Sequence, residues 1–394
     1  MPSTILKDQN LRIIFSITLM AVMGVASLTP VFPAMREIFD LSARQVGYLV
    51  TFFTLPGVIL TPFFGILADR LGRKVVLIPS LFLFSIAGTA CGFMESFTWL
   101  LVFRFIQGMG SAALGSINIT LIGDLYEGRK RAEAMGYNAS VLSVGTAVYP
   151  AIGGGLATMA WYYPFLLPAL ALPVGLWVVC CLKNPEPEKG QKLGNYLSNT
   201  WKLLLDRQVL GLFILSVLTF IILYGSFLTY LPVMLGERFQ APAWQIGVLM
   251  SASSIATAIT SSMLGRLTDR FSDLTLLVSS YILYVLAMVL IPFVMGIWQV
   301  LIPALLFGMA QGINIPGLMN ILSGLAPLKY RAIFMSINGW VLRIGQTLGP
   351  LIIGAVYLAG GTLWAFLAGA MVAVLMIVIV VFLVGGNAIA RKQI

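Results

Sequence analysis

The chain has 394 residues, 59% hydrophobic and only 10% charged, which excludes a water-soluble globular domain, where about a quarter of the residues are charged. It contains no histidine, which excludes histidine-based proton relays and most zinc chemistry, and we expect neither a metal nor a cofactor. The net charge of +10 could attract nucleic acid, but the basic residues gather at the ends of apolar segments, and we expect no nucleic-acid partner.

Twelve apolar stretches are spread along the whole chain. A hydrocarbon core about 30 Å thick needs about 20 apolar residues per helix, and unpaired backbone amides cannot face lipid. The pattern therefore predicts an all-α integral membrane protein with twelve transmembrane helices. These are expected at residues 11–33, 44–65, 75–94, 98–121, 133–156, 162–182, 209–232, 244–265, 275–295, 298–322, 333–356 and 361–386.

The basic residues are divided unequally between the two sides of the membrane. If the chain begins in the cytoplasm and alternates, only Arg36, Arg44 and Arg238 of the 24 lysines and arginines fall outside. Arg104 and Arg343 fall within spans, and the other 19 fall inside. The positive-inside rule then predicts a multi-pass protein of the inner (plasma) membrane with both termini in the cytoplasm.

The sequence matches itself at an offset of 200 residues: Asp69 recurs as Asp269, and Pro150 recurs as Pro350. The offset is constant over spans 2 to 5 and 8 to 11, which predicts two six-helix halves. Because six is an even number, both halves enter the membrane in the same direction, related by a pseudo-twofold axis along the membrane normal. We expect an N-terminal half at 1–182, a cytoplasmic linker at 183–208 and a C-terminal half at 209–394.

Glycines and charged residues follow the second stretch. From Gly65 to Lys74 the chain reads Gly-Ile-Leu-Ala-Asp-Arg-Leu-Gly-Arg-Lys, which resembles the loop signature of the major facilitator superfamily. The resemblance implies a loop that holds the two halves in one conformation, with a carboxylate at the inner end of the fourth span, here Asp124, paired with Arg73. The expected residues of this switch loop are Gly65, Asp69, Arg70, Gly72, Arg73, Lys74, Asp124, Asp269 and Arg270.

The fourth stretch contains an arginine. The run Arg-Phe-Ile-Gln-Gly-Met-Gly from Arg104 resembles a second motif of the same family, which is associated with proton coupling. An arginine inside a span costs about 2.5–3.5 kcal/mol on insertion scales, so it requires a function or a partner. No carboxylate lies near the middle of any predicted span, and Glu37 and Asp40, near the outer edge, are the candidates to reach it. The expected coupling residues are Arg104, Gln107, Gly108, Glu37 and Asp40.

The fifth stretch contains a glycine-rich run from Gly145 to Gly154, which resembles the antiporter motif that marks exporters in the superfamily. Tyr149 stands where that motif has glycine, whereas the eleventh stretch carries the glycine form at Gly349. Glycines let helices approach closely. The expected motif residues are Gly145, Tyr149, Pro150, Gly153 and Gly154.

Polar and aromatic side chains inside the spans are candidates to line a cavity, although each could instead form a hydrogen bond between helices. Arg343 lies about eleven residues into its span, roughly 16 Å from the inner surface at 1.5 Å per residue. Its counterpart in the first half is Ser143, so the repeat does not require it. The expected cavity residues are Asn118, Tyr137, Asn138, Tyr224, Gln311, Asn314, Asn338, Trp340, Arg343 and Gln346.

Together the motifs resemble those of twelve-span drug/proton antiporters, a family of multidrug or aromatic-compound exporters. The resemblance implies a secondary active exporter of hydrophobic or aromatic small molecules that is coupled to protons and works by alternating access. We expect a monomer in contact with membrane lipid, and not an enzyme. Two alternatives stay open: an organic-anion or lipid-headgroup carrier that uses Arg104 and Arg343, and a non-transporting membrane receptor.

Overall fold

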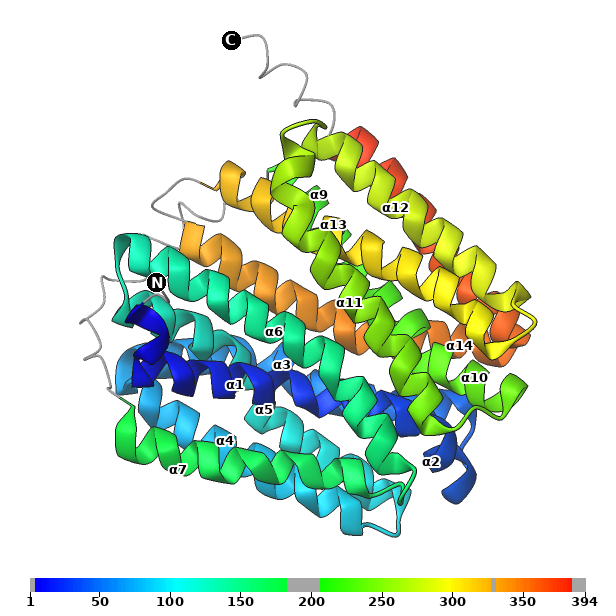
Figure 1. The fold of residues 1–394 in the computed structure, drawn as a ribbon, viewed down its shortest axis with the longest axis horizontal. Coiled ribbons are helices and arrows are strands. Elements are labelled where there is room, and N and C mark those ends of the chain that lie inside the picture. The colour runs from blue at the N-terminus through cyan, green and yellow to red at the C-terminus, as the bar shows by residue number, and fades with distance from the viewer. Residues whose placement is uncertain (1–3, 183–205, 327–330, 385–394) are drawn as a thin grey trace. The chain divides into compact units, whose positions relative to one another are not determined.

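The computed structural model describes residues 4–182, 206–326 and 331–384, and these segments are helical almost throughout, with no strand among them (Figure 1). Eleven helical segments of the described chain are long and apolar enough to cross a membrane. The last, Phe334–Leu383, has 50 residues. At 1.5 Å per residue it is about 75 Å long, more than twice the thickness of a hydrocarbon core. Gly361, with φ of 70°, divides it into two spans, which confirms the predicted all-α fold with twelve spans.

The chain forms two compact units. The first contains residues 1–41, 48–190 and 242–251, and the second contains 42–47, 191–241 and 252–394. Residues 183–205, which make up most of the predicted linker, lie outside the described part of the chain. The predicted boundaries of the two halves and of the linker therefore stay a prediction.

In the first unit, α4 packs on α5 and α7, and α1 packs on α5 and α6. Glycines bring the backbones together, since a Cβ on Gly110 would lie only 2.6 Å from the backbone nitrogen of Phe84. The helices that contribute to this unit are α1 (Gln9–Ala26), α2 (Phe32–Ile38), α3 (Ala43–Leu71), α4 (Arg73–Ala90), α5 (Phe97–Leu125), α6 (Gly128–Ala157) and α7 (Ala171–Cys181), with 3-10 turns η1 (Thr4–Lys7), η2 (Thr29–Val31), η3 (Cys91–Phe93) and η4 (Tyr163–Leu170).

In the second unit, α9 packs on α13 and α14, and α12 packs on the same two helices. Its seventh span contains a π-helical segment, η5 (Ile222–Tyr230), which the sequence did not predict. The other elements are α9 (Arg207–Ile221), α10 (Leu231–Phe239), α11 (Ala243–Thr268), α12 (Asp273–Leu290), η6 (Ile291–Phe293), η7 (Ile297–Val300), α13 (Leu301–Leu325), α14 (Arg331–Ile379) and η9 (Val380–Val384).

The segment between the second and third spans differs from the expected loop. The helix α3 continues to Leu71 and α4 begins at Arg73, so that only Gly72 separates them. Gly72 has φ of 97° and ψ of 147°, a conformation that L side chains rarely adopt. The predicted span ended earlier because hydropathy records only the apolar part of a helix, while its polar end can continue beyond the hydrocarbon core.

Candidate functional site

The first copy of the loop motif ties three helices together at the end of α3. Arg73 Nε donates to Asp124 Oδ2 at 2.9 Å, with the two side chains 15% and 33% exposed. Lys74 Nζ donates to the carbonyl oxygen of Val179 at 2.6 Å. Val179 lies in the last turn of α7, where carbonyls have no partner within the helix. The motif thus links α4 to both α5 and α7; the side chain of Asp69 lies outside the described part.

The second copy of the motif lacks this arrangement. Asp269 and Arg270 follow the end of α11 and are exposed. The repeat position of the pairing arginine is occupied by Asp273, an acid. Ser272 instead caps α12, its hydroxyl accepting from the backbone nitrogen of Thr275 at 3.2 Å. Among the described residues, the arginine–aspartate pair is therefore found in the first unit and not in the second.

The structure shows a hydrogen bond that the sequence did not predict, and it involves Tyr126, two residues after Asp124. Tyr126 donates its hydroxyl to Asp8 Oδ2 at 2.7 Å. Asp8 also caps α1 by accepting from the backbone nitrogen of Asn10 at 2.9 Å. Burial, together with the bond to Asp8, raises the pKa of Tyr126 well above its usual value. The tyrosine therefore remains a protonated donor at neutral pH, and it connects the start of α1 to the end of α5.

Arg104 is only 1% exposed, and its guanidinium bonds to neutral acceptors on three helices. Its Nε donates to the carbonyl oxygen of Leu49 in α3 at 3.1 Å. Its Nη1 donates to the carbonyl oxygen of Gly24 in α1 at 2.9 Å and to Gln107 Oε1 at 2.8 Å. Its Cζ lies 4.3 Å from the centre of the Phe53 ring, within the range of a cation–π contact.

Among the described residues, the structure brings no carboxylate to Arg104. Glu37 and Asp40 have exposed side chains and do not pair with it. Gly108, another predicted coupling residue, lies against the backbone of Phe53, where a Cβ would overlap the chain. Carbonyl oxygens stabilise a cation without accepting a transferable proton, so a role for Arg104 in coupling stays a prediction.

The antiporter motif packs α6 against α1. A Cβ on Gly145 would lie 3.1 Å from Leu19 Cδ2, and one on Gly153 would overlap the carbonyl of Ser27. The second unit repeats this contact between α14 and α9, where a Cβ on Gly345 would lie 2.5 Å from the carbonyl oxygen of Val217. The five motif residues that are buried in α6 are Gly145, Tyr149, Pro150, Gly153 and Gly154.

Two predicted cavity residues of the first unit share one hydroxyl. Thr18 Oγ1 in α1 donates to Asn138 Oδ1 at 2.6 Å and accepts from Asn118 Nδ2. Thr18, Asn118 and Asn138 are all less than a tenth exposed. The structure thus places both asparagines in hydrogen bonds between helices, which join α5 and α6 to α1. Tyr137 is half-buried beside them in the chain.

In the second unit, two hydroxyl groups form the corresponding hydrogen bonds between helices. Ser216 Oγ donates to Asn338 Oδ1 at 3.0 Å, and Thr219 Oγ1 accepts from Asn314 Nδ2 at 2.7 Å. These bonds join α14 and α13 to α9. Gln311, one turn before Asn314, is 4% exposed, and its amide has no hydrogen-bond partner among the described residues.

Arg343 lies in a different environment from Arg104. Its side chain is half-buried, and Nη1 donates to Gln346 Oε1 at 3.3 Å. Tyr224, in the π-helical segment η5, is close enough to interact with it electrostatically, and stacks on Phe220 with ring centres 5.9 Å apart. Trp340, one turn earlier in α14, is 37% exposed. The structure thus gathers three predicted cavity residues, Tyr224, Arg343 and Gln346, at one place.

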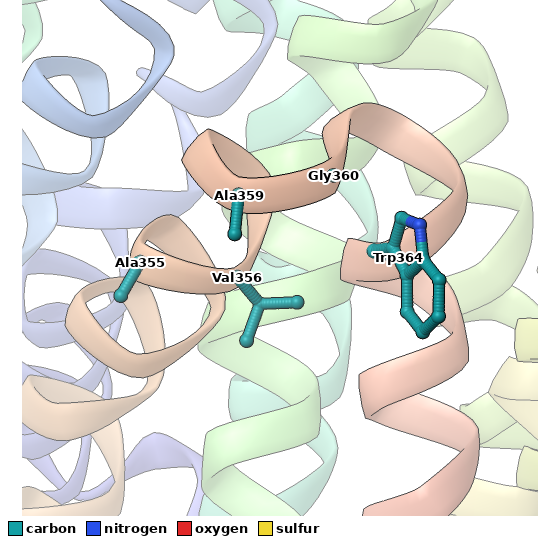
Figure 2. Close-up of a pocket in the computed structure, with 5 residues that line it drawn as sticks. All are labelled: Ala355, Val356, Ala359, Gly360 and Trp364. Carbon is teal, nitrogen blue, oxygen red and sulfur yellow. The ribbon is translucent and has the colours of Figure 1, made fainter.

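The hollows in the described part of the second unit include a narrow crevice and a larger opening. The crevice has a volume of about 10 Å³, room for roughly one water, and is lined among others by Phe220, which stacks on Tyr224, and by Leu318 and Leu342. A hollow of about 480 Å³ lies at the bend of α14, where Val356 and Trp364 project from the two arms of the helix (Figure 2). Its lining carries no charge, and the indole N–H of Trp364 is the one side-chain group in it that can form a hydrogen bond, so it offers little to select a solute.

Comparison with protein families gives one match that spans almost the whole chain. The profile of the Major Facilitator Superfamily matches residues 14–250 and 234–393. The quinolone resistance protein NorA of Staphylococcus aureus (strain Mu50) is 26% identical over 344 residues, or 85% of this chain and 86% of that protein. Multidrug resistance protein 1 of Bacillus subtilis (strain 168) is 26% identical over 359 residues, covering 89% and 90%.

Solved structures share the fold at lower identity. A bacterial homologue of the human lysosomal transporter Spinster, in an inward-facing and occupied conformation, aligns with a TM-score of 0.73 and 18% identity, covering 98% of this chain and 96% of that one. The nucleoside transporter NupG aligns with a TM-score of 0.76 and 14% identity, covering 94% and 97%. At these identities the likeness establishes the fold and leaves the substrate open.

Proposed function

Because the chain belongs to the Major Facilitator Superfamily, we propose that it is a secondary active exporter of hydrophobic or aromatic small molecules that exchanges them for protons by alternating access. The observation that carries this proposal is the match, over most of the chain, to two resistance proteins, one named for quinolones and one for multiple drugs. Both termini lie in the cytoplasm in this proposal, as the excess of basic residues on that side predicts.

The packing of α6 and α14 supports this proposal. In both units glycines replace side chains where these helices cross α1 and α9, and Gly153 and Gly345 leave no room for a Cβ. Contacts made by small residues depend on shape rather than on interlocking side chains. Such helices can shift against their neighbours without breaking side-chain contacts, which a protein that alternates between two conformations requires.

The proton carrier in this proposal lies away from Arg104, whose bonds go to carbonyl and amide oxygens. Carboxylates at the outer ends of spans are the candidates, and Glu237 is one, because it accepts a hydrogen bond from Tyr357. Substitutions Glu37→Gln, Asp40→Asn and Glu237→Gln test this directly. In proteoliposomes, the variant that lacks the carrier keeps downhill flux of substrate and loses the effect of a pH gradient.

Resistance and dye efflux test the exporter proposal in cells. The chain is expressed in a bacterium that lacks its main efflux pumps, with its amount in the membrane matched to that of an unrelated membrane protein. We expect higher inhibitory concentrations for several aromatic drugs, and faster efflux of ethidium that stops when a protonophore is added. Binding of these compounds to the purified protein without any flux would instead identify the receptor alternative.

A further inference from the structure

The two embedded arginines differ in how many of their donors are satisfied. Arg104 is 1% exposed and bonds to three acceptors at 2.8 to 3.1 Å. Arg343 is half-buried, and its bond to Gln346 Oε1 is 3.3 Å long. Among the described residues, no carboxylate pairs with Arg343. The second unit therefore holds a cation inside a span, where a charge is unfavourable without a function or a partner, and most of its donors have no acceptor among the described residues.

Helix packing fixes the position of η5, the segment that carries Tyr224. A Cβ on Gly225 would lie 2.7 Å from the carbonyl oxygen of Gly349, so η5 and α14 are in backbone contact two turns beyond Arg343. The π-helix places an additional residue in this turn, and Thr229 Oγ1 donates to the carbonyl oxygen of Tyr224 at 2.6 Å. π-helical segments are rare and occur frequently at functional sites, and η5 has nine residues.

The polar side chains that line the crevice next to Phe220 already form hydrogen bonds with each other or with neighbouring helices. Ser216 is bonded to Asn338, and Thr219 is bonded to Asn314. The remaining lining of the adjacent crevice is largely apolar and includes Phe220. Arg343 thus has free donors and lies near a stacked aromatic pair, and no acid among the described residues pairs with it to attract a cationic ligand. A guanidinium matches the two oxygens of a carboxylate with a pair of parallel hydrogen bonds.

We propose that Arg343 and the stacked rings of Tyr224 and Phe220 form a binding subsite in the second unit for aromatic monoanions. Arg343 binds the acidic group, and the two rings contact the aromatic body of the ligand. Arg104 takes no part in binding, because its side chain is 1% exposed and bonds to acceptors within the first unit. This inference rests on the proposed export of aromatic compounds and names the substrate class that this unit selects.

The test compares two ligands that share a ring system and differ in charge. Binding of 2-naphthoate and of 2-(aminomethyl)naphthalene to the purified full-length protein is measured by calorimetry in lipid nanodiscs. We expect the wild type to bind the anion more tightly than the cation. Arg343→Gln should weaken naphthoate binding by about tenfold or more, since hydrogen bonds to charged groups contribute about 1.5–3 kcal/mol, and should leave binding of the amine unchanged. Arg129→Gln, which removes an exposed arginine from the start of α6, should bind like the wild type.

Arg343→Lys keeps the positive charge and loses the paired hydrogen bonds, so it tests the site if Arg343→Gln does not fold. It should weaken naphthoate binding severalfold without affecting the amine. Equal naphthoate affinity in the wild type and in the folded Arg343 variants overturns the inference.

Ethidium efflux separates this inference from the proposed function. If the variants export ethidium but bind naphthoate like the wild type, only the subsite is wrong. If the wild type shows the predicted binding but exports nothing, the subsite stands and export is wrong.

Discussion

The Nη1 atom of Arg104 lies 2.9 Å from the carbonyl oxygen of Gly24, a residue 80 positions earlier in the chain. A second bond from the same side chain reaches the carbonyl oxygen of Leu49. A single buried cation therefore holds α5 against both α1 and α3. In this arrangement the arginine joins helices, whatever further part it has in coupling.

Replacing Arg104 should therefore lower stability and flux together. Arg104→Gln cannot reach both carbonyls, and we expect it to reduce the free energy of unfolding by about 2–3 kcal/mol, the value of one or two hydrogen bonds to a charged group. Denaturant unfolding in detergent measures this change, with Arg129→Gln as the control. If Arg104→Gln unfolds like the wild type but abolishes proton-driven flux, the arginine acts mainly in coupling.

Gly153 and Gly155 provide a matched pair of substitutions in one helix. Gly153→Ala would place its Cβ on the carbonyl of Ser27, whereas nothing lies within 4 Å of a Cβ at Gly155. Overpacking typically costs about 1–3 kcal/mol, and glycine in a helix is about 1 kcal/mol worse than alanine. We expect Gly153→Ala to lower the melting temperature and Gly155→Ala to leave it unchanged or raise it. Equal effects of the two substitutions would show that α6 does not pack on α1 in this way.

Removing the hydroxyl group of Thr18 should lower the stability of the protein more than removing that of Ser216. Thr18→Val removes the hydroxyl that serves both Asn118 and Asn138, while Ser216→Ala affects only the bond to Asn338. A buried polar group without a partner costs about 1–3 kcal/mol. Thr18→Val should therefore destabilise the protein about twice as much as Ser216→Ala in the same unfolding assay. The opposite order would contradict the shared hydrogen bond.

The pair formed by Arg73 and Asp124 should contribute little to stability. Both side chains are partly exposed, and such pairs contribute about 0.2–1 kcal/mol. A double-mutant cycle with Arg73→Gln and Asp124→Asn should give a coupling energy in this range that decreases as salt is added. Exchanging the two residues, Arg73→Asp with Asp124→Arg, should restore part of the coupling. Strict additivity at low salt would exclude the ion pair.

Hydropathy and the 200-residue repeat predicted the twelve spans, because each span must bury its backbone polar groups in apolar surroundings. The same signals could not predict where the helices end. The helix α3 continues past its apolar part to Leu71, and the corner at Gly72 depends on one positive φ. The π-helix η5 was also missed, since inserting one residue into a helical turn leaves the composition of the span unchanged.

Within the candidate site, residue type was easier to predict than bonding partner. Arg104 was singled out because an arginine is rare in a span, but its acceptors include backbone carbonyls, which every residue carries and no pattern distinguishes. The asparagines were identified as polar residues of the spans, and only the structure places Asn118 against Thr18. Arg343 was the least expected residue, and the structure gives it Tyr224 as an aromatic neighbour.

Flux into proteoliposomes tests the central claim, proton-driven export of aromatic compounds, most directly. Purified protein is reconstituted, a pH gradient is imposed, and accumulation of ethidium and of 2-naphthoate is followed with the gradient present and after a protonophore has collapsed it. The account predicts accumulation against a concentration gradient that requires the proton gradient and is absent from protein-free vesicles. Accumulation that is equal with and without the gradient would contradict proton coupling, and binding without any flux would contradict transport itself.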